Sequence, residues 1–303
     1  MSQPDSGWPT KNQPAAPSGG TSASSAAAGS GSGDIAGAPA VATPSTPMGT
    51  AAGSGADIAV TVPPAPPVSD AFRITELYLR DPHLFAGISD LTERPVLNVS
   101  INQILIPDKI SMDADHDGFL DLSILFLMSS GAIAASSTLV SVDGKCAANA
   151  PLRCVPDLDS GVRATWEIET RTTGNCLEPL PGTTSGYQPS ISVPSAPCFA
   201  SSVSEELVFN LGGVDVPVIG ARVSATYQSQ PATALVNGLI AGFVTNTAAM
   251  RVILPDEAGP PAAGSSLGDY VRQQDHDLVS SPTGEDGFWI YMNFVAERIE
   301  YTP

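Results

Sequence analysis

Apolar and polar positions alternate in short runs from residue 69 onward. Val, Ile, Leu, Thr and aromatic residues recur at every second position, and Pro, Gly and Asn separate the runs, which is typical of β-strands. The runs with this pattern are 71–80, 95–106, 119–128, 137–143, 163–170, 204–212, 214–228, 234–245 and 288–301. Nine strands with few long helical patterns predict an all-β domain, a β-sandwich or jelly roll.

Two of these runs show which faces become buried. The even-numbered positions from Leu120 to Met128 are all apolar, which predicts a strand packed on a core. In 288–301 both faces are apolar, so we expect a central strand covered on both sides. Short helices are predicted at 246–254, ended by Pro255, and at 266–269, where Ser-x-x-Asp has the spacing of a capping box.

Residues 1–68 lack this alternation and consist mainly of Ala, Gly, Ser, Pro and Thr. Such a segment buries too little apolar surface to offset the entropy of ordering it. The sequence therefore predicts a disordered tether over 1–68 and one folded domain over 69–303.

Charge narrows the class of partner. The net charge is −18. The predicted domain holds 28 of the 31 Asp and Glu and 12 of the 13 Lys and Arg, so acids outnumber bases in it by more than two to one. An acidic surface repels phosphate backbones and anionic lipids and attracts cations. We expect no nucleic-acid partner.

The stretch "DADHDGFLDL", residues 113–122, carries the clearest chemical signal. Carboxylates at alternate positions, followed by a glycine that permits a turn, can direct several oxygens at one cation. The predicted ligands are the side chains of Asp113, Asp115, Asp117 and Asp121 and the backbone carbonyl of Phe119. Calcium suits so many carboxylates better than magnesium does.

This loop resembles the calcium loops of EF-hands and dockerins, and more closely the β-hairpin loops of integrin-like FG-GAP repeats. It departs from the EF-hand at the twelfth position, where Ile124 replaces a bidentate Glu, and a strand-like run follows Gly118. The resemblance implies calcium binding through the loop residues but no propeller, because the loop occurs once. Acidic stretches at 275–277 and 284–287 are candidates for a missing ligand or are solvated loops. The alternative for the main loop is an acidic turn that binds nothing tightly.

Four cysteines, Cys146, Cys154, Cys176 and Cys198, have no zinc-site spacing. Two disulfides are expected, with 146–154 and 176–198 the simplest of three pairings, in an extracytoplasmic protein. The alternative is four buried free thiols in a cytosolic protein, for which a calcium sensor is the corresponding function.

The chain opens on polar residues and contains no run of eighteen apolar residues. Its low-complexity beginning resembles the tether that follows the lipidated cysteine of bacterial surface lipoproteins. That resemblance implies a secreted or outer-membrane-anchored protein, with the membrane reached only through an N-terminal lipid anchor.

Catalytic signatures are weak. The chain contains no H-E-x-x-H, P-loop or G-x-G-x-x-G, and its one G-x-S-x-G match, residues 264–268, does not follow a predicted strand as a nucleophile elbow requires. The three histidines (83, 116 and 276) are expected to be structural or surface residues. Trp166, Trp289, Tyr270 and Tyr291 can stack on sugars, but core packing is the expectation for Trp289 and Tyr291, which lie in the strand covered on both sides. No catalytic residue is predicted.

The sequence thus predicts a calcium-stabilised surface protein with a binding, adhesion or structural role toward a cell-surface protein or polysaccharide. A carbohydrate-binding module or a calcium-dependent hydrolase is the alternative.

Overall fold

The computed structural model describes residues 68, 70–93, 100–129, 135–157, 160–210, 214–258, 262–277 and 281–301. These residues all belong to the second of two units into which the chain divides, Val62–Pro303. The tether predicted for 1–68 lies outside the described residues except at Val68.

Most of the described chain is extended. The strands are β1 (Asp70–Asp81), β2 (Phe85–Ala86), β3 (Ser89–Asp90), β4 (Ile124–Met128), β5 (Ser136–Ala147), β6 (Ala150–Pro156), β7 (Val162–Arg171), β8 (Cys198–Ser201), β9 (Ser204–Asn210), β10 (Asp215–Gln228), β11 (Ala234–Thr245), β12 (Gly287–Arg298) and β13 (Glu300–Tyr301).

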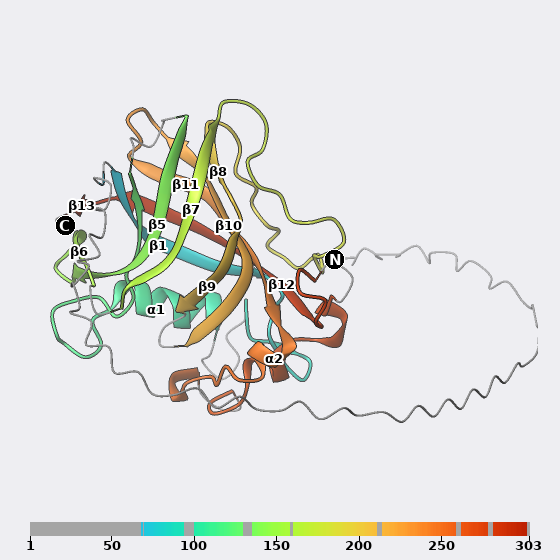
Figure 1. Cartoon of the computed structure of the whole chain (residues 1–303). Helices are drawn as coiled ribbons and strands as arrows, with labels where there is room; N and C mark the ends of the chain where they lie inside the picture. The colour runs from blue at the N-terminus through green and yellow to red at the C-terminus, as the bar shows by residue number, and fades with distance from the viewer. Residues whose placement is uncertain are drawn as a thin grey trace, which may run out of the picture. The chain divides into compact units, whose positions relative to one another are not determined.

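Eight of these strands close into an antiparallel barrel, in the order β1, β12, β11, β10, β8, β7, β5 and β4 (Figure 1). The strand β5 completes the circle because it pairs with β4 through Leu139 to Asp143 and with β7 through Ser136 to Val142. The predicted sandwich is therefore wrong: one sheet closes on itself, where a sandwich needs two. Alternation of period two marks inward and outward positions equally in both architectures.

The barrel interior is filled by large side chains. Phe72, Phe126, Trp166, Phe199 and Phe294 are each at most 1% exposed and belong to one cluster. The indole nitrogen of Trp166 donates to the carbonyl of Ala221 at 3.1 Å, so its polar atom is satisfied inside the core. Trp166, considered for sugar stacking, is therefore a core residue.

A second apolar cluster lies on the outer side of β4 and β5. It contains Leu120, Leu125, Leu127, Val142 and the Cys146–Cys154 pair, with Ile299 near the C-terminus. The even-numbered residues from Leu122 to Met128 face the barrel core as predicted, whereas Leu120 belongs to this outer cluster. The strand itself begins only at Ile124, because residues 119–123 complete a loop.

The strand β12 has both faces covered, as predicted from its sequence. It lies between β1 and β11, and Phe288, Ile290, Met292 and Phe294 belong to the barrel core. On the other face, Tyr291 packs with Leu177 and Ile191. These two belong to residues 172–197, here named the strap, which joins β7 to β8 and runs along the outside of the barrel (Figure 1).

Short helical segments lie below the strands in the view of Figure 1. They are η1 (Ile101–Leu105), α1 (Ile106–Ser111), α2 (Asn246–Ala249), η2 (Asp256–Ala258), η3 (Leu267–Tyr270) and η4 (Gln273–Asp275). The predicted helix at 246–254 is thus only four residues long, and that at 266–269 is a single 3₁₀ turn.

The strand predicted for 95–106 is wrong where it can be compared, because 101–106 is helical; residues 95–99 lie outside the described chain. The side chain of Ser100 accepts the N–H of Gln103 and caps the first turn. Asn102 points its amide at β1, where it bonds both the N–H and the carbonyl of Leu79 at 2.8 Å. These tertiary bonds override the apolar alternation.

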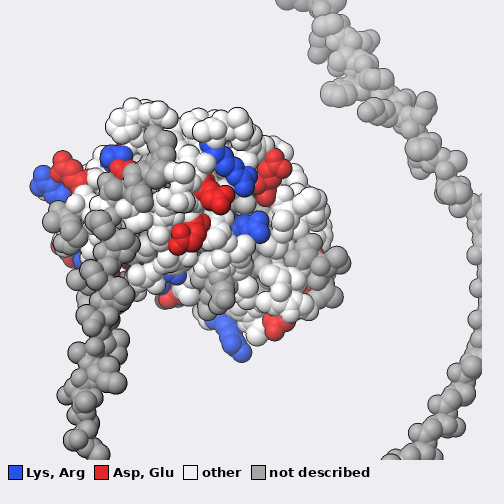
Figure 2. Space-filling view, turned by 45° about the horizontal axis from the view of Figure 1, so that its top comes forward, with Lys and Arg blue, Asp and Glu red and all other residues white. Residues whose placement is uncertain are grey.

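Charged side chains are dispersed on the face seen in Figure 2, where acidic and basic residues alternate among many uncharged ones. Basic residues of the described chain also take part in ion pairs, for example Arg163 with Asp143. The excess of acids therefore does not form one continuous patch on this face.

Candidate metal site

The predicted calcium loop lies between α1 and β4 and is closed by backbone bonds. The N–H of Asp121 donates to the carbonyl of Met112, and that of Leu122 donates to the carbonyl of Lys109, both at 2.9 Å. Two further hydrogen bonds join the loop to the β5–β6 hairpin. The N–H of Leu120 donates to the carbonyl of Cys146 at 2.9 Å, and the N–H of Ala148 donates to the carbonyl of Gly118 at 3.0 Å. The loop thus connects three elements of the fold.

Three of the predicted ligands come together. Asp113, Asp115 and Asp117 each place one carboxylate oxygen within 4.8 Å of the other two. Asp113 is half-buried, while Asp115 and Asp117 are exposed. Among the described residues, this is the one cluster of at least three acidic, histidine or cysteine side chains with metal-site spacing.

Backbone N–H groups hold these carboxylates in position. Asp113 accepts the N–H of Asp117 and of Gly118, each at 3.0 Å, and Asp117 accepts the N–H of Phe119 at 2.8 Å. Gly118 has a φ of 91°, in the region that a side chain strains, so the glycine allows the turn. The cluster is therefore built by the loop backbone itself.

The backbone N–H of Phe119 is directed at the carboxylate of Asp117. Phe119 forms an isolated antiparallel bridge with Ala147, and the two hydrogen bonds of that bridge come from the neighbours Gly118 and Leu120. In this kind of bridge, the N–H and C=O of the central residue point away from the partner strand. The carbonyl of Phe119 thus points away from the β5–β6 hairpin.

Asp121 does not join the cluster. Its carboxylate lies 3.3 Å from Nζ of Lys109 on α1 and accepts the N–H of Ala114 at 2.9 Å. A paired carboxylate that closes the loop differs from the metal ligand predicted at this position. The sequence showed no basic residue within the loop, and the partner comes from the preceding helix.

The two acidic stretches suggested as extra ligands lie in a different network. In the first, Asp275 accepts the hydroxyls of Ser185 and Tyr187 from the strap. In the second, the carboxylate of Asp286 accepts a hydrogen bond from Nδ2 of Asn246 at 2.7 Å. Neither belongs to the described metal-site cluster.

A buried carboxylate close to Asp275 was missed in the sequence. Asp81 is 3% exposed at the end of β1 and accepts the N–H of Ser185 at 2.8 Å. Burial raises the pKa of Asp81 to about 6, the charge of Asp275 adds to this, and the N–H bonds from Ser185 and Gly186 oppose it. No local motif marks Asp81, because its environment is made by a strap about one hundred residues away.

His83 and His116 occupy the structural and surface positions expected for them, whereas the side chain of His276 is only 14% exposed. His83 is 1% exposed, its Nδ1 lies 2.8 Å from Asp90, and its ring stacks on Tyr187 with the centroids 4.2 Å apart. His116 lies within the loop with a positive φ of 61°. His276 contacts Asn246 at 3.0 Å.

Tyr291, one of the aromatic residues considered for sugar stacking, is fully buried, and its hydroxyl accepts the N–H of Leu180. Trp289 is half-buried beside it, and their rings stack at 6.4 Å. Tyr270 is 7% exposed. These aromatic side chains pack within the molecule, as expected for Trp289 and Tyr291.

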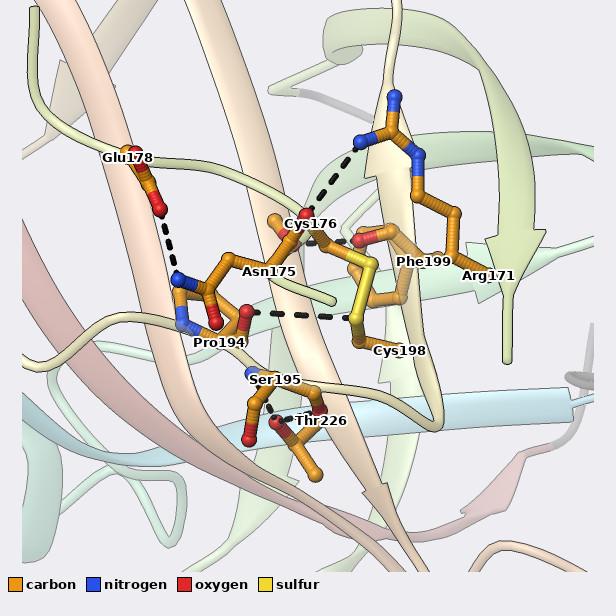
Figure 3. Close-up of a disulfide and its surroundings, with 10 residues drawn as sticks. Arg171, Asn175, Cys176, Glu178, Pro194, Ser195, Cys198, Phe199 and Thr226 are labelled. Carbon is orange, nitrogen blue, oxygen red and sulfur yellow. Dashed lines mark hydrogen bonds between the residues drawn. A yellow bond between two sulfur atoms is a disulfide. The ribbon is translucent and has the colours of Figure 1, made fainter. Parts of the chain in front are cut away.

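Both expected disulfides are present, Cys146–Cys154 and Cys176–Cys198. The second joins the start of the strap to β8 (Figure 3). Around it, Arg171 donates to the carbonyl of Asn175 at 3.3 Å, and Asn175 donates to Glu178 at 2.6 Å. Two disulfides are consistent with an extracytoplasmic location.

No helix among the described residues is both long and apolar enough to cross a membrane. The chain matches no protein-family model, and neither a curated protein nor a solved structure is significantly similar to it. The arguments about function therefore rest on the residues and geometry of this chain alone.

Proposed function

We propose that the protein is a calcium-stabilised extracytoplasmic barrel with a binding or adhesive role, in which the 113–121 loop holds the ion. The observation that carries this proposal is the convergence of the carboxylates of Asp113, Asp115 and Asp117 within 4.8 Å. Asp113 to Asp117 supply three charged ligands, and the carbonyl of Phe119 supplies a fourth oxygen.

Electrostatic repulsion favours an ion there. Two unit charges 4 Å apart repel by roughly 1 kcal/mol in water and about 4 kcal/mol at an effective dielectric constant of 20. The N–H bonds to Asp113 and Asp117 offset part of this repulsion. A divalent cation would remove the rest, and calcium accepts six to eight oxygens, so water would complete the shell.

The position of the loop explains how an ion would stabilise the whole domain. The loop bonds to α1 at Lys109, to the β5–β6 hairpin at Cys146 and Ala148, and continues into β4. An ion that fixes the loop would therefore hold the helix, the hairpin and a barrel strand together. Its effect grows with free calcium above the dissociation constant.

Localisation at the cell surface belongs to the same proposal. The two disulfides support an oxidising compartment. The composition of residues 1–68 supports a tether of the kind found in bacterial surface lipoproteins. A cell-surface protein or a polysaccharide is the proposed partner, and calcium is the proposed resident ion.

The test starts from EDTA-treated full chain and measures its melting temperature at increasing calcium concentrations. With a dissociation constant near 0.1 mM, 10 mM calcium should add about 2.7 kcal/mol and raise the melting temperature by about 5–10 °C. Asp115→Asn should remove most of this rise. Asp256→Asn, an exposed aspartate in η2, is the matched control and should keep it.

An equal calcium response in the parent and in Asp115→Asn would contradict the assignment of the ion to this loop. No response in either protein would contradict the calcium proposal as a whole. Magnesium at the same concentration should produce a smaller shift, because it accepts a crowded set of carboxylates poorly.

A further inference from the structure

A cavity of about 60 Å³ lies at one end of the barrel. Its walls come from the end of β1 and the starts of β10 and β12, through Leu79, Val216, Phe288 and Ile290. Helical segments cover it from the other side, including Ile106 of α1 and Leu267 of η3. The space therefore lies between the barrel and the segments that cap it.

The chemistry of the lining is uniform. Sixteen of the described residues line it, and none of these is an Asp, Glu, Lys, Arg or His; the hydroxyl of Tyr270 is the single polar side-chain group among them. Most of the wall is deeply buried, with Val216 at 1%, Phe288 at 2% and Ile290 at 4% exposed. The walls are thus almost wholly hydrocarbon.

Such a space suits a hydrocarbon better than water. Water needs two to four polar partners to remain in a cavity, and this lining does not provide them. A void leaves the wall atoms without dispersion contacts on one side, and an apolar guest restores those contacts. A cavity with room for one water measures roughly 10–15 Å³. The cavity of about 60 Å³ therefore has room for about four to six atoms of similar size.

The cavity lies where eight-stranded barrels offer space. Barrels of this size are filled by side chains or hold one small ligand, and ligand sites occur at their mouths. Here Phe72, Phe126, Trp166 and Phe199 fill part of the interior and do not line the cavity. This unfilled space lies at the end under α1 and η3.

We infer that this cavity is a binding site for a short uncharged hydrocarbon group of about four to six carbon atoms. A free small molecule or the end of an aliphatic tail on a larger amphiphile would present the same group. A charged group is disfavoured, because the described part of the lining offers no counter-ion and desolvating a charge is costly. The site is separate from the proposed metal loop and does not depend on it.

The experiment is a methyl-NMR titration of the full chain with the series of linear alcohols from butan-1-ol to decan-1-ol. The methyl chemical shifts of cavity residues such as Leu79 and Val216 should change and reach a plateau as the alcohol concentration rises. Those of Val162, which is 62% exposed, should not. Each added carbon should tighten binding about fourfold up to hexan-1-ol, where the dissociation constant should be on the order of 1 mM.

The longer alcohols distinguish the two sources of the group. Affinity that levels off beyond six carbons indicates a short free molecule that fits within the cavity. Affinity that continues to rise to decan-1-ol indicates an aliphatic tail that enters the cavity with its end. Both results support a hydrocarbon site and differ only in the ligand.

Two cavity-filling variants provide the specific test. Ala258→Leu and Ala262→Leu enlarge buried lining residues and should weaken binding of hexan-1-ol at least tenfold. Val162→Leu, on the surface of β7, should change it less than twofold. Absence of saturable shifts in the parent, or unchanged binding in a folded cavity variant, would overturn the inference. If neither variant folds, the location of the shifts in the parent decides.

Discussion

The ammonium of Lys109 lies 3.3 Å from the carboxylate of Asp121, and this ion pair joins α1 to the end of the acidic loop. Asp121 also accepts the N–H of Ala114, so both of its oxygens have partners in the protein. The pair separates the roles of the loop acids: Asp113, Asp115 and Asp117 converge on one point, while Asp121 closes the loop on the helix.

This division predicts different calcium responses. Asp121→Asn should lower stability by about 1 kcal/mol through loss of the ion pair, and the rise in melting temperature with calcium should remain. Asp115→Asn should remove that rise. Melting curves of both variants with and without calcium make the comparison, and loss of the calcium response in Asp121→Asn would show that Asp121 is a ligand.

Gly118 should matter for calcium as well as for stability. A side chain at its φ of 91° is strained, so Gly118→Ala should cost about 1–2 kcal/mol. Gly161→Ala is a matched control, because Gly161 has a φ of 71° and open space around it but lies away from the loop. Calorimetric titration should show weaker calcium binding in Gly118→Ala only; equal affinity in both would contradict a role for the turn.

The two disulfides should differ in their effect on calcium. Replacing Cys146 and Cys154 by Ala should cost about 2.5 kcal/mol and replacing Cys176 and Cys198 about 3.4 kcal/mol, because the closed loops differ in length. Only the first pair lies in the hairpin that bonds the metal loop, through the carbonyl of Cys146. The calcium-induced shift should therefore fall in the first double variant and persist in the second, and the reverse order would contradict this coupling.

The raised pKa of Asp81 should make the free energy of unfolding depend on pH in a specific way. Its pKa is raised from 3.8 to about 6, so between about pH 4 and pH 6 the folded protein binds more protons than the unfolded chain. The stability that protonated Asp81 provides is complete below about pH 4 and is lost as the pH rises through 6. The parent should lose more stability over this range than Asp81→Asn does.

Urea unfolding at a series of pH values measures this difference. Asp256→Asn is the control and should keep the slope of the parent. An unchanged slope in Asp81→Asn would show that the buried carboxyl group does not titrate in this range.

Some of the fold could be predicted because it depends on local or near-local physics. Alternation of apolar residues over 137–143, 163–170, 214–228 and 234–245 predicts β5, β7, β10 and β11, since successive side chains of a strand point to opposite faces. The disulfide pairs joined cysteines that are neighbours along the chain. The carboxylates of Asp113 to Asp117 converge because they lie on one short turn.

Other features depended on residues distant in sequence. The helical turn at Ile101 follows from bonds between Asn102 and the backbone of Leu79, against the local pattern. The environment of Asp81 comes from the strap, and the strands β6 and β8 were not predicted, since each is short and depends on a long neighbouring strand.

The sequence by itself therefore determined most of the long strands and where the acidic loop lies, and it favoured the cysteine pairs that form, because period, separation and composition are local. Only the tertiary structure decided that β5 pairs with both β4 and β7 to close a barrel, and that Asp121 pairs with Lys109. Strand partners and ion-pair partners are chosen by the three-dimensional packing of the whole chain, and the local pattern of one segment is compatible with several choices.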